Sequence, residues 1–396
     1  MRIGLVLSNV PQYSETFFIS KINGLAQNGF SVFVFANGSR ADCRGLSRPN
    51  VRVIRPFSVC RSCVLQVLKS AFVFIYLFVC CPKRFFRFIR AERADRLSWG
   101  RVFRDLYINA HILPRGLDWL HFGFATMGIG RENTAYAIGA LSAVSFRGYD
   151  ISLFPLKHAG CYSRLFLKVD KVHSISDGLY RSALALGLSR EKAYMKITPA
   201  INIRHFQSQG EFSFFEFPLR ILSVGRLTWK KGYEYAIEAI SILRGMGIDV
   251  EYTIVGAGED RERLLYAAYQ WGVQNRVHLI GKCQHDAIPS IMVQHDFYLQ
   301  PSVQEGFCNA ALEAQGCGLI CIVSDAEGLP ENVLDGRTGF VVPKRDAQAI
   351  ADVISRIIHL PREELISITR YAAKRVHDEF NLELQIKKFI RFYNEV

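Results

Sequence analysis

Short apolar runs alternate with longer stretches in which apolar residues recur every three or four positions along most of the chain. The short runs predict buried strands, and the longer stretches predict helices. Regular alternation of this kind favours parallel sheets built from strand–helix–strand units, and therefore an α/β fold. Strands are expected at residues 2–7, 31–36, 51–54, 117–122, 143–146, 171–176, 193–198, 219–225, 250–255, 276–280, 297–300 and 319–323.

The alternation is interrupted by a polar and aromatic segment at residues 207–218. A segment of this composition is typical of a linker. We expect residues 1–202 to form one Rossmann-like domain, 203–218 a linker, and 219–379 a second domain. The last amphipathic helix, within 380–396, is expected to dock back on the first domain.

The charge balance points to anionic partners. The chain has 49 lysine and arginine residues against 36 aspartate and glutamate residues, a net charge of +13. Nucleotides, sugar phosphates, phospholipid surfaces and nucleic acid are all compatible with this charge. No zinc-finger, RNP-type or helix-turn-helix signature is present, which argues against nucleic acid.

Cysteine usage and the first residues predict a cytoplasmic protein. Of the ten cysteines, Cys60 and Cys63 form one C-x-x-C pair, and no second pair has zinc spacing. Reduced, buried thiols are therefore expected. Residues 1–8 are short and have the pattern of a first strand, which differs from a signal peptide.

Residues 64–104 suggest contact with a membrane. The apolar stretch 64–81 is interrupted by Gln66, Lys69 and Ser70, and its unbroken part is too short to span a bilayer. Residues 82–104 then carry eight basic residues against two acidic ones. Together these segments predict a helix pair on the anionic inner face of the cell membrane. The alternative is a core helix followed by a solvated basic helix.

Two glutamates, Glu305 and Glu313, lie eight positions apart between two apolar strands. Glu305 is expected before a helix, at the carboxyl end of a strand, where open α/β sheets bind ligands. Glu313 should lie about 12 Å further along that helix, and Gly306 allows a ligand to approach the backbone. Two carboxylates at this separation suit an extended ligand with hydroxyls at both ends, such as a nucleotide sugar. The alternative is a pair of solvated glutamates on a helix surface.

A basic loop at residues 225–232 lies between a strand and a helix. Arg226 and Lys231, together with free N–H groups of the helix, favour a diphosphate site; a solvated loop is the alternative. The later motif Gly256-Ala-Gly258 lacks the third glycine of a dinucleotide fingerprint, because Arg261 stands in that place.

In the first domain, His121, Arg147 and Asp150 lie at strand ends, where each could face a cleft. A structural position is the alternative for His121, and Asp150 could be the partner of Arg147. Residues 14–17, Ser-Glu-Thr-Phe, place hydroxyls and an acid close to a helix start, which favours an anion-facing role.

Taken in order, these motifs resemble those of the family-4 retaining glycosyltransferases, which have the GT-B fold of two Rossmann-like domains whose parallel sheets face each other across a cleft. In the first domain, residues 14–17 and 147–150 resemble the subset that builds bacterial exopolysaccharide and lipopolysaccharide, as in colanic-acid-type clusters. The segments that carry the resemblance in the second domain are residues 223–232, 254–258, 299–302, 305–313 and 335–343.

The resemblance implies roles for the second domain. Arg226 and Lys231 would hold the donor diphosphate, Glu313 would bind the ribose, and Glu305 would face the donor sugar. The donor would be a UDP- or GDP-sugar, with neither a metal nor another cofactor. The backbone that would contact the sugar hydroxyls and the phosphate lies around Gly306, Phe307, Cys308 and Asn309.

The resemblance also implies the reaction. A sugar would pass, with retention, to a lipid-linked saccharide bound on the first domain, and closure would bring Arg147 and His121 to the sugar. The chain departs from the family at Arg147, where a histidine is usual, and at Glu327, where a glycine pair is usual. The alternative function is a non-catalytic protein of this fold that binds a nucleotide sugar or scaffolds a membrane assembly.

Overall fold

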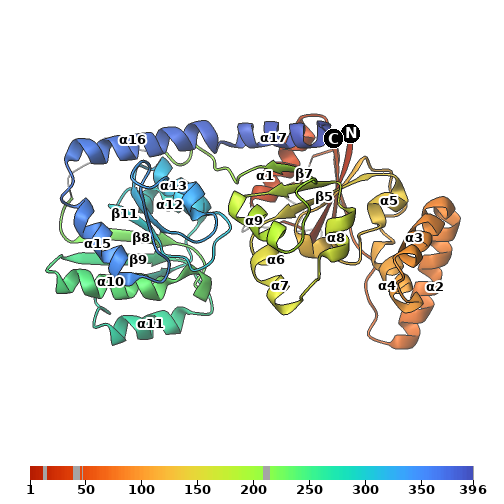
Figure 1. The fold of residues 1–396 in the computed structure, drawn as a ribbon, viewed down its shortest axis with the longest axis horizontal. Helices are drawn as coiled ribbons and strands as arrows, with labels where there is room; N and C mark the ends of the chain where they lie inside the picture. Colours follow the sequence, from red (N-terminus) through yellow and green to blue (C-terminus); the bar gives the residue numbers. More distant parts are fainter. Residues whose placement is uncertain (12–15, 39–44, 47, 208–214, 396) are drawn as a thin grey trace. The chain divides into compact units, whose positions relative to one another are not determined.

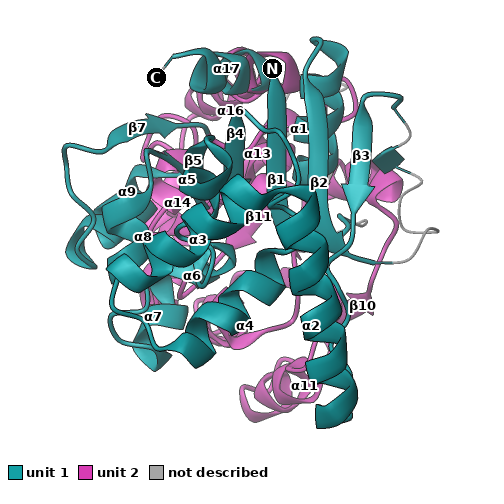
Figure 2. Cartoon of the chain, turned by 90° about the vertical axis from the view of Figure 1, so that its right-hand side faces the viewer, with its two compact units in different colours: residues 1–197, 386–396 teal, residues 198–385 magenta. Residues whose placement is uncertain are grey.

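The structure is a computed structural model of the 396-residue chain, and it describes all residues except 12–15, 39–44, 47, 208–214 and 396 (Figure 1). The chain divides into two compact units, coloured separately in Figure 2. Unit 1 comprises Met1–Ile197 and Ile386–Val396, and unit 2 comprises Thr198–Gln385. The first division thus falls a few residues before the expected position 202, and the second falls within the last helix.

Unit 1 contains a seven-stranded parallel sheet with the order β3-β2-β1-β4-β5-β6-β7. Its strands are β1 (Arg2–Asn9), β2 (Ser31–Asn37), β3 (Val51–Ile54), β4 (Trp119–Phe122), β5 (Leu141–Phe146), β6 (Lys171–Ser174) and β7 (Ala193–Lys196). Its helices are α1 (Thr16–Gln27), α2 (Cys63–Cys80), α3 (Pro82–Ala94), α4 (Trp99–Asn109), α5 (Thr134–Ile138), α6 (Tyr149–Ser152), α7 (Phe154–Lys157), α8 (Ser163–Lys168), α9 (Asp177–Ala185) and the larger part of α17 (Leu382–Asn394), with a 3-10 turn η3 (Ala125–Gly128).

Unit 2 contains a six-stranded parallel sheet with the order β10-β9-β8-β11-β12-β13. Its strands are β8 (Leu219–Val224), β9 (Val250–Val255), β10 (Val277–Gly281), β11 (Phe297–Gln300), β12 (Ile320–Ser324) and β13 (Phe340–Val342). Its helices are η4 (Trp229–Lys231), α10 (Tyr233–Gly245), α11 (Arg261–Gln270), η5 (His285–Ala287), α12 (Ile288–Met292), α13 (Asn309–Gly316), α14 (Leu329–Asn332), α15 (Ala347–Ile357) and α16 (Arg362–Glu379).

Both sheets share the doubly wound strand order in which the first and fourth strands are neighbours. In unit 1 these are β1 and β4, and in unit 2 they are β8 and β11. The chain reverses its direction of progress across the sheet at this point, so the loops that follow the two strands diverge. Open α/β sheets bind ligands between such loops.

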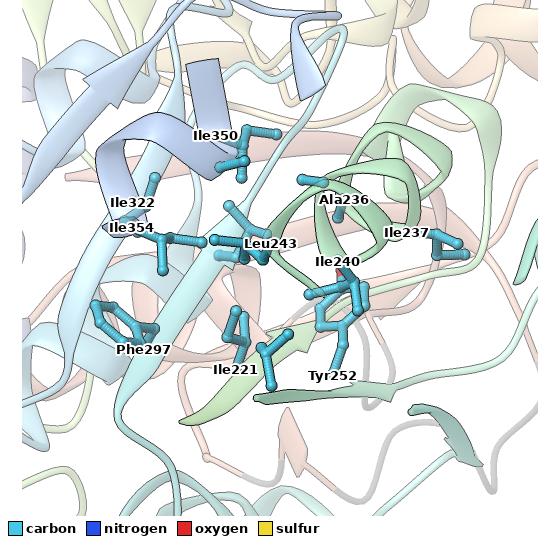
Figure 3. Close-up of a cluster of buried hydrophobic side chains, with 14 of the residues drawn as sticks. Ile221, Ala236, Ile237, Ile240, Leu243, Tyr252, Phe297, Ile322, Ile350 and Ile354 are labelled. Carbon is cyan, nitrogen blue, oxygen red and sulfur yellow. The ribbon is translucent and has the colours of Figure 1, made fainter. Parts of the chain in front are cut away.

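The core of unit 2 explains why its helices lie where they do (Figure 3). Helix α10 places Ala236, Ile240 and Leu243 on one face, the spacing of an amphipathic helix. This face packs over the sheet beside Ile221 of β8 and Tyr252 of β9. Full burial of a side chain of this size stabilises the fold by roughly 1.5–3 kcal/mol relative to exposure, so this core fixes the strand ends.

Helix α17 carries the end of the chain into the core of unit 1. Phe389, Phe392 and Tyr393 are buried there with residues of β1 and β2. The indole Nε1–H of Trp119, on β4, donates a hydrogen bond of 3.0 Å to the carbonyl oxygen of Tyr393. The amphipathic pattern of residues 380–396 is thus used to cover the sheet of unit 1.

Helix α2 is exposed, so the alternative that it forms a core helix does not hold. Only 11% of its 18 residues are buried, and Val73 and Leu77 are the buried ones. Large apolar side chains such as Phe72 and Val79, each 70% exposed, lie on its surface. The helix is also longer than the unbroken apolar run, because Gln66 does not end it. By length and composition alone, α2 is long and apolar enough to cross a membrane.

Candidate active site

The loops that follow β8 and β11 meet at the switch point of unit 2. The backbone N–H groups of Val303 and Gln304 both donate to the carbonyl oxygen of Lys230, at 2.7 and 3.2 Å. Gly232 ends the basic loop with a φ of +62°, and a Cβ there would overlap the carbonyl oxygen of Pro301. A glycine is therefore needed at this position, and it lets the two loops pack together.

Lys231 and Glu305 form an ion pair between these loops. Lys231 Nζ donates to Glu305 Oε2 at 2.5 Å, and the two side chains are 18% and 17% exposed. Burial opposes the charge of Lys231, but the charge of Glu305 and its hydrogen bond hold the lysine pKa above its usual value. Lys231 therefore stays charged and is held against Glu305.

Arg226 supplies a second cation at the same strand end. Its side chain is exposed, and within the described part of the chain it forms no ion pair. Its guanidinium is close enough to Lys230 to contribute to lowering that lysine's pKa, after the larger effect of burial. Arg226 is thus a free guanidinium beside a fixed Lys231–Glu305 pair, which suits a diphosphate.

The segment between the two glutamates is largely buried. Gly306, Phe307 and Cys308 are buried, while Asn309, the first residue of α13, is partly exposed. The N–H of Cys308 donates to Asn332 Oδ1 at 2.9 Å, and Asn332 Nδ2 donates back to the Cys308 carbonyl oxygen at 3.0 Å. The expectation that the Cys308 backbone is open to a ligand is therefore wrong for this structure, because Asn332 occupies both of its polar groups.

Glu313 lies on α13 and is nearly buried, with 10% of its side chain exposed. Its Oε1 lies 3.2 Å from Nε2 of His285, in the turn η5 after β10. The hydrogen bond to Glu313 is the main cause that raises the His285 pKa above its usual value. His285 was not among the predicted site residues, because no spacing rule connects a histidine in a loop to a glutamate 28 positions later.

Glu327 adds a negative charge to the site. The backbone N–H of Glu305 donates to Glu327 Oε2 at 2.6 Å. Burial, with a smaller contribution from Glu305, raises the Glu327 pKa, while its hydrogen bond opposes the shift. Its φ of +27° is unusual for a residue that is not glycine. The departure from the usual glycine pair thus places a carboxylate on a backbone amide of the loop between β11 and α13.

One group of side chains could hold a metal ion. The ligand atoms of His205, His285 and Asp286 all lie within 4.8 Å of one another. Asp286 is 94% exposed in its side chain, however, and His285 already bonds to Glu313. Exposed groups of this kind are common without an ion, so their geometry alone gives no reason to assign a metal.

In unit 1, Arg147 and Asp150 organise the loop after β5. The Arg147 guanidinium lies 4.1 and 4.4 Å from the ring centroids of Phe17 and Phe18, a cation–π arrangement. Asp150 is buried and accepts hydrogen bonds from the backbone N–H groups of Ala125, Arg147 and Gly148. Burial raises the Asp150 pKa despite these bonds. Asp150 therefore holds the backbone, and Ser14 and Glu15 of the predicted anion-facing segment lie outside the described residues.

His121 is fully buried, so the expectation that it faces a cleft is wrong for this structure. The hydrogen-bond partners of the His121 ring show which of its two nitrogens carries the proton. His173 Nε2 lies 2.9 Å from the Ile197 carbonyl oxygen, which requires an N–H there, and its Nδ1 therefore accepts from Ser145. Ser145 Oγ in turn accepts from His121 Nε2, and His121 Nδ1 accepts from the Tyr393 hydroxyl at 2.6 Å. Burial lowers the pKa of both histidines, so both rings are neutral.

Comparisons with known proteins identify the class. Residues 208–375 match the family described as glycosyl transferases group 1. The chain is 30% identical over 278 residues to the amylovoran biosynthesis glycosyltransferase AmsK of Erwinia amylovora, covering 68% of this chain and 67% of that protein. The chain therefore belongs to the group 1 glycosyltransferases. It is also 29% identical over 272 residues to the putative colanic acid biosynthesis glycosyltransferase WcaL of Escherichia coli, covering 67% of this chain and 66% of that one.

Solved structures show the same fold. Anabaena HepE in complex with UDP aligns over 100% of both chains with a TM-score of 0.72 and 16% identity. The sucrose-phosphate synthase of Thermosynechococcus elongatus aligns with a TM-score of 0.68 and 18% identity, over 100% of this chain and 98% of that one. These neighbours are GT-B glycosyltransferases. The predicted fold class, two Rossmann-like domains of the GT-B type, is thus confirmed.

Proposed function

We propose that this glycosyltransferase moves a sugar, with retention, from a UDP- or GDP-sugar to a lipid-linked saccharide in bacterial surface polysaccharide biosynthesis. The observation that carries the proposal is the Lys231–Glu305 pair beside the free guanidinium of Arg226, at the switch point between β8 and β11. The names of the relatives, which concern amylovoran and colanic acid, support the polymer class. The neighbour HepE was solved with UDP-glucose, which supports a nucleotide sugar.

In the proposed reaction, Arg226 and Lys231 neutralise the diphosphate as it departs, and no metal or further cofactor is required. The acceptor oxygen forms a bond to the anomeric carbon on the face from which the diphosphate leaves. The C–O bond to the diphosphate breaks, and its oxygen takes the acceptor proton. Glu305 faces the sugar hydroxyls, and Glu313 accepts hydrogen bonds from the ribose. The products are the glycosylated acceptor and a nucleoside diphosphate.

Arg147 belongs to the acceptor side in this proposal. A guanidinium does not lose its proton at neutral pH, so Arg147 cannot act as a base and its role is electrostatic. Its stacking on Phe17 and Phe18 fixes the position of that charge. His121 contributes indirectly, because its buried ring connects β4 to the last helix.

We further propose that residues 64–104 hold the protein on the anionic inner face of the cell membrane. The exposed apolar side chains of α2 support insertion into the interface, and the basic residues of α3 support attraction to anionic lipids. A lipid-linked acceptor resides at this surface, so the placement would bring enzyme and acceptor together.

The test is donor hydrolysis by the purified protein against UDP-, GDP-, ADP- and CMP-sugars, with and without EDTA, followed by the anomeric configuration of the product. We expect slow release of one nucleoside diphosphate, unaffected by EDTA and lost in Glu305→Ala. Nucleotide binding without turnover, even with membrane lipid extract present, would instead support the non-catalytic alternative. The charge of Glu327 on the donor loop is the observation that favours that alternative.

A further inference from the structure

A cavity lined by arginines lies at one edge of the unit 1 sheet, opposite to the edge at which the Arg147 loop follows β5. Its volume is about 460 Å³. Arg2 and Ser31 begin neighbouring strands β1 and β2, and Arg52 pairs with Phe33 of β2 from strand β3. Arg115 lies in the loop that leads to β4. All of these residues are therefore at or near the amino ends of their strands.

This position separates the cavity from the proposed chemistry. The loop of Arg147 follows the carboxyl end of β5. Strand β5 pairs in parallel with β4, and β4 pairs in parallel with β1. Strand β1 has eight residues, and a strand of that length spans roughly 25 Å. The arginine cavity and the Arg147 loop are thus at opposite edges of one sheet.

The three arginines of the cavity have no acidic partner in the described part of the chain. No ion pair involves the side chain of Arg2, Arg52 or Arg115 among these residues, and all three are exposed. The nearby carboxylate of Asp118 accepts a hydrogen bond of 2.6 Å from the backbone N–H of Arg2. Three cations around one cavity repel one another, and an anion bound among them would relieve that repulsion.

A fourth arginine joins the cavity to the basic helix. Arg84, on α3, donates to the carbonyl oxygens of Leu113 and Arg115 at 3.1 and 2.8 Å. These bonds fix the loop that leads to β4 and carries Arg115. At Gly116 the space that a Cβ would fill lies 3.2 Å from a guanidinium nitrogen of Arg2 and 3.9 Å from one of Arg84. Two guanidinium groups thus flank a position without a side chain.

We propose that this cavity binds a phosphate group. A guanidinium group can donate two parallel hydrogen bonds to the oxygens of one phosphate, and Arg2, Arg52 and Arg115 all line the cavity. The cavity has the size of an ordinary small-molecule site, so it accommodates a phosphate together with a substituent. Two sources share this chemistry: a phospholipid headgroup, which the adjacent basic helix α3 would bring close, and a soluble phosphate compound.

The experiment compares two double variants of the full chain that lose the same charge. Arg52→Gln/Arg115→Gln removes two cations of the cavity, and Arg181→Gln/Arg190→Gln removes two exposed arginines elsewhere on unit 1. Calorimetry with inorganic phosphate measures the soluble source. Co-sedimentation with phosphatidylcholine vesicles, with and without phosphatidic acid, measures the lipid source. Phosphate binding at Arg226 and Lys231 is common to both variants and cancels in the comparison.

We expect the cavity variant to bind phosphate or phosphatidic acid vesicles about tenfold more weakly than the control variant. The arm in which the difference appears identifies the source of the phosphate. Equal binding by the two variants in both arms would overturn the proposal. Donor hydrolysis is measured in parallel. It should stay unchanged in both variants, because neither removes a residue of the proposed donor site in unit 2. A failure of the proposed function is therefore seen separately.

Discussion

The two units use the same strand order but treat charge at their strand ends differently. In unit 2, Lys231 and Glu305 lie at the switch point, partly exposed and paired, and the lysine pKa is raised. In unit 1, Lys21 of α1 and His121 of β4 are both fully buried. Burial, with a smaller effect of nearby cations such as Arg147, lowers the pKa of both. The charged form of Lys231 in unit 2 is therefore favoured, whereas burial disfavours the charged forms of Lys21 and His121 in unit 1.

This difference shows that a polar residue near a strand end need not belong to a ligand-binding site. The carboxylate of Glu305 is available to a ligand because pairing with Lys231 offsets its partial burial. The polar groups around His121 instead satisfy one another in a hydrogen-bonded series from Tyr393 through His121 and Ser145 to His173. Such a fully bonded interior network stabilises a fold, because each member would be costly to bury alone.

The largest expected effect separates the roles of Glu305 and His121. Glu305→Gln should lower kcat by about a hundredfold or more, with little change in unfolding temperature, because it removes charge where the donor reacts. His121→Gln should instead lower the free energy of unfolding by about 1–3 kcal/mol, because it breaks a buried hydrogen-bond chain. Donor turnover and thermal unfolding measure the two effects, with Glu262→Gln as a surface control. Turnover that falls only for His121→Gln would reverse the assignment.

A second prediction concerns pH. Burial, with Arg131 and Arg115, lowers the pKa of His111 in unit 1 to about 3. The unfolded chain takes up a proton below about 6.5, which the folded chain refuses, so stability is lost as pH falls below that value. Between pH 8 and pH 5 this loss is about 2 kcal/mol.

Urea unfolding of the wild type and His111→Gln at several pH values checks this loss, which the variant should lack. His285 in unit 2 should behave oppositely, because Glu313 raises its pKa. Its contribution is full below about 6.5 and is lost as pH rises through the folded pKa. If His285→Gln and His111→Gln changed the pH dependence in the same direction, the contrast between the units would fail.

A third prediction tests whether Arg226 is free for the donor. Arg226→Met should weaken donor binding by about tenfold, the loss of one charge-assisted contact with phosphate. Stability should stay the same, because Arg226 has no ion pair within the described residues. The measurement is the donor Kd by calorimetry, with the exposed Arg261→Met as the control. Equal affinities for both variants would remove Arg226 from the donor site.

The smallest expected effect concerns Glu327. Glu327→Gly should tighten donor binding by about threefold, because it removes a negative charge beside the phosphates and frees the Glu305 N–H. It also places glycine at the strained φ of +27°. Glu327→Gln separates charge from backbone strain, since it changes only the charge. Weaker donor binding in both variants would show that Glu327 supports the site.

Much of the fold follows from the apolar pattern, since β3 and β11 have the predicted bounds of residues 51–54 and 297–300. The sequence also places Lys231 and Glu305 in loops that follow strands, but it did not predict the ion pair between them. The burial of His121 could not be anticipated, because β4 is covered on both faces and its sequence does not show which neighbours would bond to its ring. Asn332 and His285 were missed because their partners lie 24 and 28 positions away, beyond any local pattern.

Helix α17 has a consequence for how the protein is made. The sheet of unit 1 begins with β1, but the core of this unit also includes Phe392 and Tyr393, which follow all of unit 2 in the chain. Lys171, on β6, likewise donates to the carbonyl oxygen of Phe392. Domains usually fold in the order of synthesis. Here unit 2 has all of its residues first, and unit 1 completes its core only after unit 2 has been synthesised.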